Sequence, residues 1–109
     1  IRRPPRSTLS SSSAASDVYK RQVIDEVIKL GGKALVTSDH GNCEQMIKND
    51  GSPHTAHTTN LVHMVYVGED SAEVILRDGI LADIAPTIID LLGVQVPEEM
   101  SGSSLISRK

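Results

Sequence analysis

A short apolar strand that leads into an Asp-His-Gly turn is the feature that most constrains this chain. Residues 34–36 read Ala-Leu-Val and are bracketed by Gly32 and Gly41. A continuous apolar run of this kind is typical of a buried strand in an α/β sheet. The run leads directly to Asp39 and His40, and ligands of α/β sheets bind at the carboxyl ends of strands. We therefore expect an α/β fold with a functional site where this strand ends.

The residue types at the strand end predict a divalent metal site. Asp39 offers a carboxylate oxygen and His40 an imidazole nitrogen, a mixture that suits manganese, zinc or magnesium. Neighbouring strand residues point to opposite faces, so both can reach one ion only where the backbone becomes irregular, which Gly41 permits. Two more histidines, His54 and His57, follow in the sequence His-Thr-Ala-His-Thr-Thr-Asn. Their closeness favours metal binding over ordinary polar surface.

These two motifs carry a family resemblance. The sequence Ser-Asp-His-Gly-Asn at 38–42, followed by the histidine-threonine segment at 54–60, resembles the C-terminal part of the 2,3-bisphosphoglycerate-independent phosphoglycerate mutases. That family belongs to the alkaline phosphatase superfamily, and the resemblance extends over about 24–106. It implies an α/β fold in which this chain is a fragment of an alkaline-phosphatase-like sheet flanked by helices. Leu61 and His63 replace two prolines of the family pattern, which places His63 outside the metal motif.

The resemblance also implies a chemistry. It predicts two divalent metal ions, with manganese expected and magnesium, cobalt or zinc as alternatives. Asp39 and His40 would bind one ion and His57 the other, with His54 in a supporting or loop role. The implied activity of the parent enzyme is the interconversion of 3-phosphoglycerate and 2-phosphoglycerate through a phosphoserine, in glycolysis and gluconeogenesis. The nucleophilic serine, the other ligands and the substrate-binding arginines belong to parts of the family chain that are absent here.

Three interpretations of function remain open from the sequence. The chain is a fragment of such a mutase, and is then expected to be inactive by itself. It could instead belong to another enzyme of the superfamily, a phosphopentomutase or a phosphodiesterase. The third interpretation is a small metal-binding or interaction domain without catalysis. It would be favoured if the isolated chain folded stably and bound a protein partner with Asp39 and His57 dispensable.

Composition and charge indicate the size of the domain and the kinds of partner that the chain can bind. The chain has 109 residues, 39% hydrophobic, with no Trp or Phe, so we expect one small domain with a core of Ile, Leu and Val. The net charge of −3 divides into +4 for residues 1–22 and −7 for residues 23–109. An acidic body argues against nucleic acid, and no apolar run is long enough to span a membrane. The single Cys43 excludes an internal disulfide. The family resemblance implies a cytoplasmic monomer acting on a small molecule.

The first segment of the chain does not read as part of a fold. Residues 1–22 are rich in Arg and Ser and show neither helical nor strand periodicity. We interpret them as a disordered, non-native segment, a translated sequencing-adapter read-through joined to a gene near Val23. A basic arm or a transit peptide is the alternative. The second segment, residues 23–109, is then the C-terminal part of the metal-binding domain.

Periodicity and turn residues predict the elements of that domain. We expect helices at 23–30, 42–48 and 83–92, strands at 34–37 and 62–67, and a weaker strand at 73–76. Asn42 would cap the second helix with Gln45 completing a capping box, and Cys43 would pack inside. Asp83 would cap the third helix.

Overall fold

The computed structural model describes residues 9–109, and residues 1–8 of the predicted disordered segment lie outside the described residues. The elements in chain order are α1 (Leu9–Lys29), β1 (Ala34–Val36), β2 (Val65–Val67), η1 (Ser71–Glu73), β3 (Val74–Leu76), η2 (Leu81–Asp83), α2 (Ile84–Leu91) and β4 (Ile106–Arg108). Helices and small sheets alternate along the chain, which confirms the α/β class.

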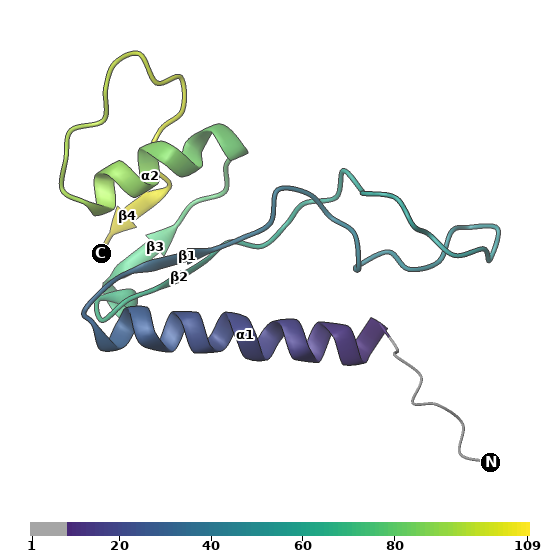
Figure 1. Cartoon of the computed structure of the whole chain (residues 1–109). Coiled ribbons are helices and arrows are strands. Elements are labelled where there is room, and N and C mark those ends of the chain that lie inside the picture. Colours follow the sequence, from purple (N-terminus) through teal and green to yellow (C-terminus); the bar gives the residue numbers. More distant parts are fainter. Residues whose placement is uncertain (1–8) are drawn as a thin grey trace.

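The strands form two antiparallel pairs. β1 pairs with β2, with Leu35 opposite Tyr66, and β3 pairs with β4, with Ile75 opposite Ser107. Helix α1 runs alongside the first pair, and α2 lies beside the second (Figure 1). The residues of β1 are half-buried, so the expectation of a fully buried strand is wrong. Within the described residues the sheet that contains β1 has only two strands, which cannot enclose it.

Helix α1 ends where the sequence predicts and begins earlier. Gly31 has a φ of 74° and donates its N–H to the Ile28 carbonyl at 2.9 Å, while the Gly32 N–H reaches the Val27 carbonyl at 2.8 Å. A glycine with positive φ just after the last helical turn is a common way for a helix to end. Residues 9–22 are helical, although no regular structure was expected there. No Pro or Gly interrupts residues 9–30, so nothing stops the helix from extending backwards. Residues 15–23 are all exposed.

Hydrogen bonds of two buried polar side chains join α2 to the C-terminal segment of the chain. Thr87 is fully buried; its hydroxyl donates to the Asp83 carbonyl at 2.6 Å and accepts the Leu105 N–H at 2.9 Å. The Asp83 carboxylate accepts the N–H groups of Ile80 and Ser103, both at 2.9 Å. These hydrogen bonds lower the pKa of Asp83. Asp83 precedes α2 as expected, but its side chain joins two loops and makes no hydrogen bond to the helix.

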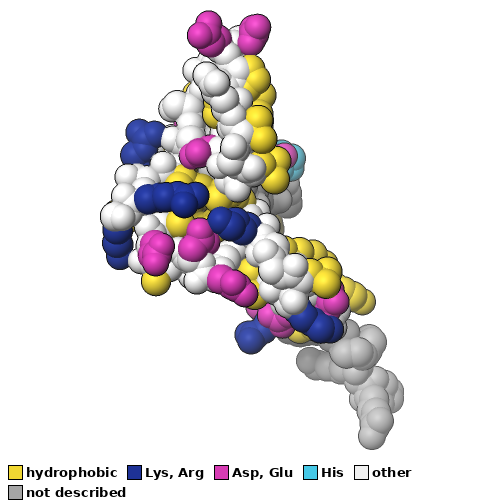
Figure 2. All heavy atoms as spheres, turned by 90° about the vertical axis from the view of Figure 1, so that its left-hand side faces the viewer, with side chains coloured by type: hydrophobic (Ala, Val, Ile, Leu, Met, Phe, Trp, Pro, Cys, Tyr) yellow, Lys and Arg dark blue, Asp and Glu magenta, His cyan; other side chains and the backbone are white. Residues whose placement is uncertain are grey.

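The hydrophobic core is thin for a chain of this length. Among the described residues, Tyr66 and Leu105 are the buried hydrophobic side chains, whereas Leu61 is 98% exposed and Leu30 is 78% exposed. Figure 2 shows apolar side chains reaching the surface in strips between charged ones. The radius of gyration is 18.0 Å, against about 13 Å for a compact domain of about 100 residues. The chain therefore leaves apolar surface that a complete domain of this size would bury.

Residues 37–64 form an arm that extends away from both sheets (Figure 1). The two halves of the arm are joined by isolated bridges, Gly41 with Thr58 and Ile47 with Pro53. The prediction of a helix at 42–48 is wrong, because the segment forms turns and bridges. The strand expected at 62–67 starts only at Val65. Cys43 is exposed rather than packed. No helix among residues 9–109 is long and apolar enough to cross a membrane.

Candidate metal centre

The predicted metal ligands lie on the arm, just beyond the end of β1. Asp39 and His40 belong to the outgoing half of the arm, and His57 belongs to the returning half. The bridge next to them consists of two backbone hydrogen bonds, from the Thr58 N–H to the Gly41 carbonyl at 2.8 Å and from the Gly41 N–H to the Thr58 carbonyl at 3.3 Å. The bridge places His40 and His57, each one residue away from it, on facing halves of the arm.

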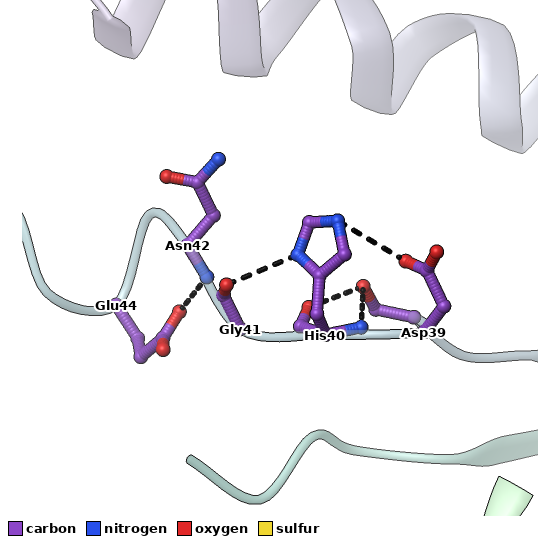
Figure 3. Close-up of polar contacts among 6 residues, drawn as sticks. Asp39, His40, Gly41, Asn42 and Glu44 are labelled. Carbon is purple, nitrogen blue, oxygen red and sulfur yellow. Dashed lines mark hydrogen bonds and ion pairs between the residues drawn. The ribbon is translucent and has the colours of Figure 1, made fainter. Parts of the chain in front are cut away.

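The two ring nitrogens of His40 have different contacts (Figure 3). Its Nδ1 lies 3.1 Å from the Gly41 carbonyl oxygen. A carbonyl oxygen can only accept, so Nδ1 is the donor in this contact and Nε2 is the ring nitrogen that faces Asp39. That Nε2 lies 3.4 Å from Oδ1 of Asp39. Two ligand atoms bound to one ion at about 2.1 Å in a tetrahedral arrangement are separated by about 3.4 Å. Asp39 and His40 therefore have the spacing of a ligand pair for one ion.

His57 stacks on His40. The ring centroids are 3.5 Å apart and the planes are inclined by only 13°. A metal ion binds an imidazole nitrogen close to the plane of that ring, so two nearly parallel rings cannot both direct a nitrogen at one ion. Paired metal sites hold their ions about 3.5–4 Å apart, which is comparable with the ring separation. The donor set therefore fits two ions better than one.

A carboxylate that the sequence analysis did not single out connects the two halves of the arm. Oε2 of Glu44 accepts the Asn42 N–H at 2.6 Å (Figure 3), and Oε1 accepts the Thr58 hydroxyl and the Asn60 side-chain amide, the latter at 3.2 Å. The hydrogen bond from Thr58 is the main cause that lowers the pKa of Glu44 to about 2, and the backbone N–H of Asn42 adds to the effect. Asn42 was expected to cap a helix; its N–H instead bonds Glu44.

The other candidate side chains stand apart from this arrangement. His54 is half-buried, its N–H donates to the Met46 carbonyl at 2.9 Å, and its Nδ1 is buried with no hydrogen-bond partner among the described residues. The His63 side chain is exposed, and its carbonyl accepts the Thr37 hydroxyl at 2.9 Å. Within residues 9–109, no group of three or more His, Cys, Asp or Glu side chains is arranged to hold one ion. The described residues thus provide a partial donor set.

A family model and a set of named relatives both match this chain. The model of the Metalloenzyme superfamily matches residues 15–96 of this chain, starting ahead of Val23. The chain is similar to proteins named 2,3-bisphosphoglycerate-independent phosphoglycerate mutase from Akkermansia muciniphila, at 54% identity over 93 residues, and from Syntrophotalea carbinolica, at 52% over 90 residues. It is 50% identical over 93 residues to the phosphoglycerate mutase 2 of Methanosarcina acetivorans. These matches cover 83–85% of the chain and 18% of each relative. The chain therefore spans less than a fifth of the length of these relatives.

Proposed function

The chain belongs to the Metalloenzyme superfamily, and from that premise we propose that it is the metal-binding C-terminal segment of a 2,3-bisphosphoglycerate-independent phosphoglycerate mutase. The parent enzyme would interconvert 3-phosphoglycerate and 2-phosphoglycerate. The observation that carries the proposal is the stacking of His40 and His57 beside Asp39, in a chain about half identical to proteins that bear this name.

We divide the three ligands between two ions, because the stacked histidine rings favour two separate positions. Asp39 and His40 would hold one ion through Oδ1 and Nε2, and His57 would hold the second. With Nδ1 donating its hydrogen bond to the Gly41 carbonyl, Nε2 would be the ring nitrogen that binds the ion. When bound, the two metal ions would stabilise an oxygen nucleophile and the charge of the transferring phosphoryl group. Manganese is our first choice of metal, with magnesium, cobalt or zinc as alternatives.

The chain's own residues would hold and orient part of the centre. Three ligands divided between two ions leave each ion short of the four or more ligands that closed sites use. The nucleophilic serine, the remaining ligands and the arginines for phosphoglycerate would come from the part of the family chain that this sequence does not cover. We therefore propose that the parent is active, as a cytoplasmic monomer on a small-molecule substrate, and that this chain alone is not.

A chimera tests this function directly. Residues 23–109 replace the corresponding segment of the Akkermansia muciniphila relative, and the purified chimera is assayed for 2-phosphoglycerate formation with manganese. We expect turnover within about tenfold of the unmodified relative, and its loss on His57→Ala. His63→Ala, which changes a histidine outside the assigned ligands, is the matched control and should retain activity. A folded chimera that binds manganese but never converts phosphoglycerate would favour another enzyme of the superfamily.

A further inference from the structure

We propose that Glu44 is a positioning residue of this metal centre, one that holds the segment bearing His57 against the segment bearing His40. The inference rests on the proposed function for its catalytic meaning and on the contacts of the arm for its geometry. It adds a side chain to the centre that neither the sequence motifs nor the ligand assignment contains.

The carboxylate joins both halves of the arm beside the stacked rings. On the outgoing half it accepts the Asn42 N–H at 2.6 Å. On the returning half it accepts the Thr58 hydroxyl, and Asn60 at 3.2 Å. Hydrogen bonds to a charged acceptor are about twice as strong as neutral ones. Thr58 directly follows His57, so the contact fixes the chain one residue from that imidazole.

The alternative supports at this level are few. Beside the rings the two halves share the Gly41–Thr58 bridge. Apart from those of Glu44, the other hydrogen bonds between the halves lie farther away: the Thr37 hydroxyl bonds the His63 carbonyl at the base of the arm, and the Met46–His54 hydrogen bond and the Ile47–Pro53 bridge lie toward its tip. Most side chains from 41 to 62 are exposed, so apolar packing contributes little here. The Glu44 contact therefore carries much of the alignment of His57 with His40.

The sequence leaves room for this contact at Gly41. A Cβ atom at Gly41 would collide with the Glu44 carboxylate and with the Thr58 hydroxyl. Gly41 does not have a positive φ, so its role here is steric: its missing side chain is the space in which Glu44 meets Thr58.

Glu44 acts through other residues rather than on a metal. Its three hydrogen-bond partners are Asn42, Thr58 and Asn60, and none of them is an assigned ligand. These donors occupy three of the roughly four acceptor positions of the carboxylate, which leaves it little capacity for an ion. Residues that orient metal ligands in this way commonly change metal affinity by roughly 10–100-fold when they are removed.

The test has two parts, and together they distinguish failure of the positioning role from failure of the proposed mutase function. In the full 109-residue chain, nuclear Overhauser contacts between the ring protons of His40 and His57 report the alignment without any metal or activity. We expect these contacts in the unsubstituted chain, their loss in Glu44→Ala, and their retention in Glu69→Ala, which removes an exposed carboxylate outside the arm. Absence of the contacts in the unsubstituted chain, or their persistence in Glu44→Ala, overturns the proposal.

The second part measures Mn²⁺ affinity in the chimera, which does not require turnover. We expect Glu44→Ala to raise the Kd roughly 10–100-fold while leaving two ions bound at saturation. Thr58→Val should have a similar effect, and Thr58→Ser, which keeps the hydroxyl, should restore tight binding. A Kd within twofold of Glu69→Ala, or complete loss of one ion as for a ligand, overturns the positioning role. An inactive chimera that still follows this pattern refutes the mutase function alone.

Discussion

The rings of His40 and His57 lie face to face with their centroids 3.5 Å apart, although one side chain comes from the outgoing and the other from the returning half of the arm. The backbone bridge between Gly41 and Thr58 brings the two halves together at this level. Because the rings are nearly parallel, the two imidazoles address different positions in space. This relationship is the basis for dividing the ligands between two ions.

Gly41→Ala should disrupt the site more than the same change at the tip of the arm. The added Cβ collides with the Glu44 carboxylate and the Thr58 hydroxyl, and overpacking of this kind costs about 1–3 kcal/mol. We expect weaker contacts between the His40 and His57 rings, measured by nuclear Overhauser spectroscopy. Gly51→Ala is the comparison: Gly51 has a φ of 83° but open space around it, so the strain should stay local. Equal effects of the two changes would contradict the steric account.

Thr87→Val should loosen the link between α2 and the end of the chain. Valine has the same shape but leaves the buried Leu105 N–H without its acceptor, at a cost of about 1–3 kcal/mol. Amide hydrogen exchange of Leu105 measures the effect, and we expect it to accelerate by roughly tenfold or more. The same substitution at the exposed Thr59 is the control and should leave that amide unchanged.

Asp70 should give the fold a pH dependence in the acid range. The Tyr66 hydroxyl, at 2.5 Å, and Lys33, at 2.9 Å, lower the pKa of Asp70 to about 2 from its usual 3.8. The folded-state pKa is depressed, so this contribution to stability is present above about pH 4 and is lost as the pH falls toward 2. Carboxyl-carbon NMR titration measures the pKa.

The hydroxyl of Tyr66 is the larger cause of that shift, and its removal is a separate test. Tyr66→Phe should raise the pKa of Asp70 toward its usual value, because Lys33 alone remains beside it. Tyr19→Phe, on the exposed part of α1, should not change it. An unchanged Asp70 pKa in Tyr66→Phe would show that the hydrogen bond is not formed in solution.

The isolated chain should lack mutase activity and bind Mn²⁺ weakly. Residues 9–109 hold no group of three or more candidate ligands around one ion, and the family resemblance implies that the nucleophilic serine lies outside this chain. Positioning provides much of the barrier reduction in phosphoryl transfer. The check is a coupled assay for 2-phosphoglycerate together with equilibrium Mn²⁺ binding on the 109-residue chain. Turnover above background that disappears on His57→Ala would show that the chain is complete as a catalyst.

Apolar periodicity and glycine positions predicted the helices and strands that short stretches of sequence determine by themselves. The glycine-bracketed apolar run gave β1, and the apolar periodicity that ends at Gly93 gave α2. The predicted weak strand at 73–76 is confirmed by β3. The interpretation of residues 1–22 as non-native stays a prediction, which reading the genomic DNA upstream of Val23 would test.

Contacts between distant segments explain what the sequence did not predict. Asn42 and Gln45 match a capping box, but no helix follows, because Glu44 bonds back to Asn42 and across to Thr58 and Asn60. Strand β4 is three residues long and exists through pairing with β3. The family resemblance predicted that His40 and His57 belong to one site, whereas their stacking and the role of Glu44 depend on how the arm folds back.

The most direct test of the two-ion assignment is the number of Mn²⁺ ions bound by the chimera at saturation, with electron paramagnetic resonance to detect spin coupling between them. The account predicts two coupled ions in the unsubstituted chimera. His40→Ala and His57→Ala should each keep one ion without coupling, because each ring serves a different ion. Retention of two coupled ions in both variants, or a single ion in the unsubstituted chimera, would contradict it.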